Sequence, residues 1–146
     1  MDLKDAHALF KRYRGWLYMM AREENEKYHD FLALNIPKTA LESWRQELLE
    51  EYFDKAQKDP QRAIFELYDI ARILKATTSL KEENGKRTLS LLEKLLQDPD
   101  SDKALLMRII YGDNDSYSDS LLCWIEKNTS LEDKLEEILN DSIETY

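Results

Sequence analysis

The sequence contains few residues that interrupt regular structure or form covalent links: three glycines, three prolines and one cysteine among 146 residues. The single cysteine, Cys123, cannot form an internal disulfide, which excludes a small secreted scaffold held together by such bonds. Cys123 lies in the apolar run LLCWI, and this context predicts a buried thiol rather than a catalytic nucleophile. Because only two histidines accompany this cysteine, the ligands of a structural zinc site are lacking, and we expect no metal and no cofactor.

Long hydrophobic runs are absent as well. Residues 15–21, GWLYMMA, form the longest weakly charged run near the start, about a third of the ~20 residues that a membrane-spanning helix needs. The polar residues REENEKYHD follow, where a signal peptide would have its small-residue cleavage site. We therefore expect a cytoplasmic protein without a membrane segment.

Apolar residues recur every three or four positions along most of the chain, which is the spacing of one face of an α-helix. No segment keeps the alternating pattern of a half-buried strand. This pattern predicts an all-α fold: a single domain over residues 1–146, arranged as an irregular bundle of about six to eight helices. A first helix of about twenty residues is expected to begin at Leu3, and further helices over 41–58, 60–76 and 104–111.

Several helix boundaries carry recognisable signals. Thr39 with Glu42, and Ser79 with Glu82, have the spacing of capping boxes at helix starts. Gly85 lies inside a helical pattern and is expected to weaken or bend that helix, because glycine is a poor helix former.

The net charge of −9 is concentrated in one part of the sequence. Residues 1–97 hold 17 basic and 17 acidic side chains, whereas residues 98–146 hold 4 basic and 13 acidic ones. At the other end, residues 1–22 carry a net charge of +3. This polarised distribution predicts that the acidic C-terminal part attracts a basic partner.

Residues 111–120, YGDNDSYSDS, alternate acids with hydroxyls as cation-binding loops do. In an EF-hand loop beginning at Asp113, Tyr117 would stand at the fifth position and Trp124 at the twelfth, where oxygen ligands are required. Since these ligands are missing, the segment is expected to end one helix at Gly112, turn, and start the next helix. Three acids and one aromatic residue in it are the predicted partner-binding residues: Asp113, Asp115, Tyr117 and Asp119.

Arg22 is followed by His29 with six residues between them. On a helical scaffold this pair resembles the catalytic signature of HEPN-domain ribonucleases. The resemblance implies that Arg22 and His29 act at the phosphate and the 2′-hydroxyl of RNA.

Residues 31–44, FLALNIPKTALESW, resemble the turn and recognition helix of helix-turn-helix domains. Asn35 stands at the turn position where that family usually has glycine, and asparagine tolerates the left-handed conformation. The resemblance implies that Lys38, Thr39, Glu42 and Ser43 face base edges or phosphates.

These features together predict a non-enzymatic protein-interaction module, such as an acidic inhibitor or immunity-type protein that binds a basic protein partner. A helix-turn-helix DNA-binding protein and a HEPN-like ribonuclease are the alternatives, although the acids around both motifs disfavour contact with nucleic acid. The polarised charge also allows a salt-sensitive homo-oligomer, in which the basic N-terminal helix of one copy meets the acidic part of another.

Overall fold

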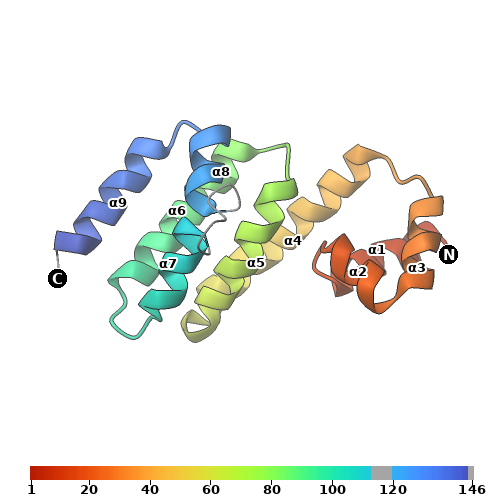
Figure 1. Ribbon diagram of the computed structural model, residues 1–146, viewed down its shortest axis with the longest axis horizontal. Helices are drawn as coiled ribbons and strands as arrows, with labels where there is room; N and C mark the ends of the chain where they lie inside the picture. Colours follow the sequence, from red (N-terminus) through yellow and green to blue (C-terminus); the bar gives the residue numbers. More distant parts are fainter. Residues whose placement is uncertain (113–119, 145–146) are drawn as a thin grey trace. The chain divides into compact units, whose positions relative to one another are not determined.

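The computed structural model describes residues 1–112 and 120–144, and within these ranges it contains nine α-helices, one short 3₁₀ helix and no strand (Figure 1). The predicted all-α fold is confirmed. The predicted number of six to eight helices is too low.

The chain forms two compact units, which we call unit 1 (residues 1–51) and unit 2 (residues 52–146). Helix α4, Lys38–Lys58, begins in unit 1 and ends in unit 2. Each unit has its own buried apolar side chains. The single domain over the whole chain stays a prediction.

Unit 1 consists of three short helices followed by the first part of α4. These are α1 (Leu3–Arg12), α2 (Leu17–Glu23) and α3 (Asn25–Ala33). The expected first helix of about twenty residues is therefore wrong, because the backbone turns left-handed at Arg14 (φ 55°) and Gly15 (φ 70°) and ends α1. A second interruption, at Glu24, separates α2 from α3. These two breaks account for the additional helices.

The core of unit 1 is built around Phe10, which is fully buried. Its ring lies 5.6 Å from the Trp44 ring and 6.4 Å from the Phe31 ring, measured between centroids. Ala6 and Phe10 of α1 are thus buried, with the Phe10 ring near α3 and α4, whereas Leu3 at the start of the helix is exposed.

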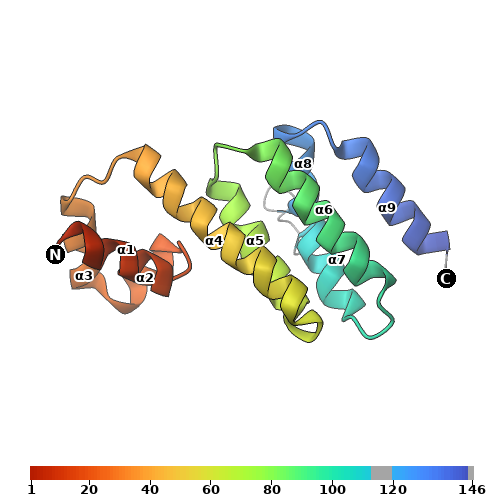
Figure 2. The ribbon, with the colours of Figure 1, turned by 180° about the vertical axis from the view of Figure 1, so that it is seen from behind.

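Unit 2 consists of the end of α4 and five further helices. They are α5 (Ala63–Ala76), entered through a 3₁₀ turn over Pro60–Arg62, α6 (Lys81–Gln97), α7 (Lys103–Tyr111), α8 (Leu121–Asn128) and α9 (Glu132–Glu144). Figure 2 shows α6 between α9 on one side and the C-terminal end of α4 on the other. Side chains from four of these helices are almost inaccessible and form the core: Leu67, Ile70 and Leu74, Leu92, Leu106 and Ile110, Leu121 and Ile125.

Polar side chains cap the starts of two helices of unit 2, α7 and α8. The Asp102 carboxylate accepts a hydrogen bond from the Leu105 amide at 3.0 Å, and the Ser120 hydroxyl accepts one from the Cys123 amide at 3.0 Å. Gly112 follows α7 with φ 83°, as predicted for a residue that ends a helix. Cys123 is 2 % exposed, which confirms the predicted buried thiol.

The two predicted capping boxes are wrong. Helix α4 begins at Lys38, one residue before Thr39, because the Pro37 carbonyl already accepts the amides of the first turn. Helix α6 begins at Lys81, and the Glu82 carboxylate accepts hydrogen bonds from the amide and the hydroxyl of Ser130, the latter at 3.1 Å. The Glu82 side chain thus bonds to Ser130, 48 positions away, instead of capping the start of its own helix.

Gly85 does not interrupt α6, which continues through it. The residue is buried, and a Cβ atom there would lie 3.0 Å from Leu131 Cδ1 and 3.1 Å from Thr129 Cγ2. Instead of marking a bend, the missing side chain lets α6 approach the connection between α8 and α9 closely. The amine of Lys81 strengthens this junction by donating to Asn128 Oδ1 at 2.9 Å.

Candidate functional site

The outer side of α9 is densely acidic. Its exposed residues are Glu132, Asp133, Lys134, Glu136, Glu137, Asn140 and Asp141. On its other side Leu135, Ile138 and Leu139 are buried in unit 2. We refer to Glu132, Asp133, Glu136 and Glu137 as the α9 acidic face, since positions three and four residues apart share one side of a helix.

The position of these acids within α9 separates two effects. Glu132 and Asp133 belong to the first turn, where a negative charge stabilises the helix by interacting with its macrodipole. Glu136 and Glu137 lie beyond the first turn, where this interaction has faded. Helix stability therefore accounts for the first pair and leaves the second pair without a structural role.

Repulsion between carboxylates extends this acidic region onto α8. The Glu126 carboxylate is the largest cause of a raised pKa at Glu132, followed by partial burial and by the charges of Glu136 and Asp133. The raised pKa means that the neighbouring carboxylates repel the negative charge of ionised Glu132. A cation bound here would relieve that repulsion.

The carboxylates of the α9 acidic face form no ion pair with any residue that the structure describes. The basic N-terminal region differs in this respect. Lys11 lies 2.9 Å from Glu51 and 3.7 Å from Glu47, and the hydrogen bond to Glu51 raises the pKa of Lys11. Arg12 lies 2.6 Å from Glu24. Two of the cations that the predicted homo-oligomer would use are thus already paired inside unit 1.

The predicted partner-binding residues Asp113, Asp115, Tyr117 and Asp119 lie outside the described residues. The α9 acidic face was not among the sites predicted from the sequence. The signal was present in the sequence: from Leu131 onward, acids occupy the positions between apolar residues spaced three and four apart.

The two residues of the ribonuclease resemblance lie on different helices. Arg22 is exposed near the end of α2, and His29 is exposed on α3, where its ring lies 5.8 Å from the Tyr28 ring. Catalysis by this pair stays a prediction.

The segment that resembles a helix-turn-helix does form two helices joined by a short turn, since α3 ends at Ala33 and α4 begins at Lys38. Asn35 is left-handed, with φ 49°, as its place in the turn predicted. Lys38 and Ser43 are exposed, whereas the Glu42 carboxylate accepts from Arg45 at 3.1 Å. DNA binding by this segment also stays a prediction.

Among the described residues, no group of three or more His, Cys, Asp or Glu side chains is arranged to hold a metal ion. Within the same ranges, none of the helices combines the length and the apolar composition needed to cross a membrane. Comparison of the chain with protein-family models, with curated proteins and with solved structures finds no match.

Proposed function

We propose that this protein is a non-enzymatic interaction module that binds a basic protein partner through the α9 acidic face, as an acidic inhibitor or immunity-type protein does. One observation carries the proposal: four exposed carboxylates lie together on one side of α9, and none of them forms an ion pair with the described residues. Unpaired like charges destabilise the free protein slightly, and a lysine- or arginine-rich surface would neutralise them.

The proposed contact would act mainly on the rate and the specificity of association. A surface of one sign steers an oppositely charged partner into place and repels partners of its own sign. Because exposed charges are screened by salt, the affinity should fall as the ionic strength rises.

Glu136 and Glu137 provide the sharpest test, since they lie beyond the first turn of α9. The double variant Glu136→Gln, Glu137→Gln removes two exposed charges while preserving size and helix propensity. The matched control, Glu26→Gln with Asp30→Asn, removes two exposed charges from α3 in unit 1. Circular dichroism establishes that both variants keep the helical content of the wild type.

Each protein is used to capture partners from a lysate of the source cells, and the affinity of the recovered, purified partner is then measured by calorimetry at low and high salt. We expect a basic protein that binds the wild type and the control equally, binds the α9 variant more weakly, and is released by salt. If the α9 variant and the control bind this partner with the same affinity, the proposed surface is wrong.

The left-handed conformation of Asn35 supports a second candidate, DNA binding by α3, the turn and α4. Retardation of duplex DNA in a gel tests it. If the candidate is right, the retardation should weaken steeply with salt, and Lys38→Glu should abolish it. Equal retardation by the wild type and this variant would remove the candidate.

A further inference from the structure

A second charged feature of unit 2 has the opposite sign. A hollow of about 220 Å³ lies between the C-terminal end of α4 and α6. None of the described residues that line it is acidic, although the whole chain has a net charge of −9. The polar side chains around it are Gln57, Arg87, Ser90 and Lys94, all of which carry hydrogen-bond donors.

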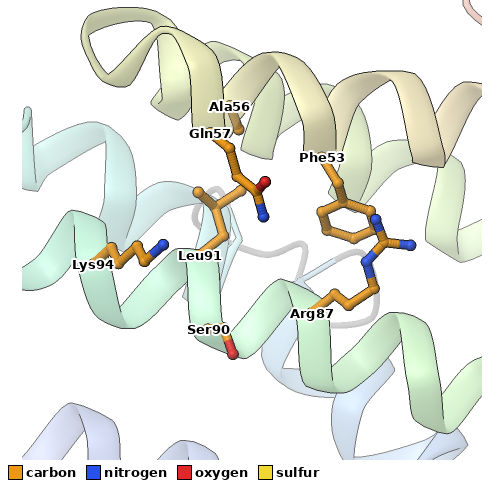
Figure 3. Close-up of a pocket in the computed structure, with 7 residues that line it drawn as sticks. All are labelled: Phe53, Ala56, Gln57, Arg87, Ser90, Leu91 and Lys94. Atoms are coloured by element: carbon orange, nitrogen blue, oxygen red, sulfur yellow. The ribbon is translucent and has the colours of Figure 1, made fainter.

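The spacing of residues on the two helices produces this arrangement. On α6, Arg87, Ser90 and Lys94 follow one another at intervals of three and four residues and therefore share one side of the helix. Figure 3 shows Arg87 beside the Phe53 ring at one end of the hollow and Lys94 at the other, with Gln57 between them.

The floor of the hollow is apolar. Phe53 and Leu91 line it and are 4 % and 8 % exposed. The guanidinium of Arg87 lies over the Phe53 ring, with its central carbon 4.3 Å from the ring centroid. This cation–π contact holds the guanidinium over the Phe53 ring. The hollow thus combines a positioned cation, a second cation and an apolar surface.

We propose that this hollow binds a small organic anion, a carboxylate or phosphate carried on an apolar body about the size of one phenyl ring. The anionic group would contact Lys94 at its end of the hollow, because ammonium groups are among the usual ligands of both anions. Arg87, at the other end, would add to the positive potential of the hollow. The apolar body would lie on Leu91 and Phe53. A single ring is the appropriate size, since pockets for larger, drug-sized ligands begin at roughly 300 Å³. This site is separate from the α9 acidic face and does not depend on the proposed function.

The experiment is an NMR titration of the purified full chain, labelled with ¹⁵N, with four probes: phenyl phosphate, benzoate, inorganic phosphate and benzyl alcohol. Phenyl phosphate or benzoate should shift the signals of α6 and of the end of α4, and should bind more tightly than inorganic phosphate or benzyl alcohol. Comparing the two organic anions decides between phosphate and carboxylate. The proposal is overturned if neither organic anion binds more tightly than inorganic phosphate, or if neither binds more tightly than benzyl alcohol.

Two lysines of α6 allow a matched pair of variants. Lys94 lines the hollow, whereas Lys86 is exposed on the same helix and does not line it. Lys94→Met should weaken the tighter organic anion about fivefold, the effect of losing one exposed charge contact. Lys86→Met changes the net charge equally and should leave the affinity unchanged. An equal effect of both variants would show general attraction of anions to α6 and would also overturn the proposal.

Discussion

Substitution of Gly85 with alanine and with valine measures what the close approach of α6 to the connection between α8 and α9 contributes to stability. Alanine in place of glycine inside a helix gains about 1 kcal/mol of intrinsic helix stability. Crowding of the new methyl group opposes this gain, because the methyl carbon would lie 3.0 Å from Leu131 Cδ1 and 3.1 Å from Thr129 Cγ2.

The two neighbours of that methyl group differ in how easily they can move. Leu131 is half-exposed, and the contacting atom is the end of its side chain, so it can shift by a few tenths of an ångström. Thr129 is held in place, because its hydroxyl donates to the Ile125 carbonyl at 2.7 Å and accepts from the Leu131 amide at 3.1 Å. We therefore expect Gly85→Ala to stay within about 1 kcal/mol of the wild type in stability.

Valine adds two further methyl groups where the first is already crowded. Overpacking of this kind costs about 1–3 kcal/mol, so Gly85→Val should be less stable than Gly85→Ala by that amount. Urea unfolding followed by circular dichroism measures the difference. Lys86→Ala and Lys86→Val, at the adjacent exposed position, measure the intrinsic preference for alanine over valine, which is about 0.5 kcal/mol. If the Gly85 pair differs by no more than the Lys86 pair, α6 does not pack against the α8–α9 connection at this point.

Three further predictions concern single side chains. The hydrogen bond to Glu24 raises the pKa of Tyr13 to about 12, and absorbance titration should show this pKa fall toward 10 in Glu24→Gln. The wild type should lose stability between pH 10 and pH 12, because only the unfolded chain ionises this tyrosine in that range. Lys103→Met should cost about 1–2 kcal/mol in urea unfolding, because the amine donates to three carbonyl groups at and just after the end of α6, at 2.6–3.1 Å. Glu126→Gln should lower the raised pKa of Glu132 in a ¹³C carboxyl titration, and an unchanged pKa would show that Glu126 does not raise it. Because the pKa is raised in the folded protein, ionisation of Glu132 opposes folding as the pH rises.

Periodicity predicted the helices of unit 2 well, because apolar residues such as Leu67, Ile70 and Leu74 are spaced for one side of a helix and are buried in the structure. It failed in unit 1, where a single apolar stripe runs across the break at Arg14. A left-handed arginine has no signature in composition, since residues other than glycine rarely adopt this conformation. Gly15 was the available local signal.

Contacts between distant residues explain what the sequence did not reveal about the sites. Glu82 has the spacing of a capping residue, but its partner Ser130 is 48 positions away. The hollow likewise depends on Phe53 and Arg87 coming together from two helices. By contrast, the α9 acidic face follows from local periodicity alone and could have been predicted.

The charges of unit 2 show why a net charge describes binding poorly. Salt at physiological strength screens exposed charges over about 8 Å, so an arriving ligand responds to the side chains nearest to it. At the hollow these are Arg87 and Lys94, and on α9 they are carboxylates. Helix α6 positions both surfaces: its first turns hold the α8–α9 connection through Glu82 and Gly85, and its later turns line the hollow. One helix thus positions both the hollow proposed to bind an anion and the acidic face proposed to bind a basic partner.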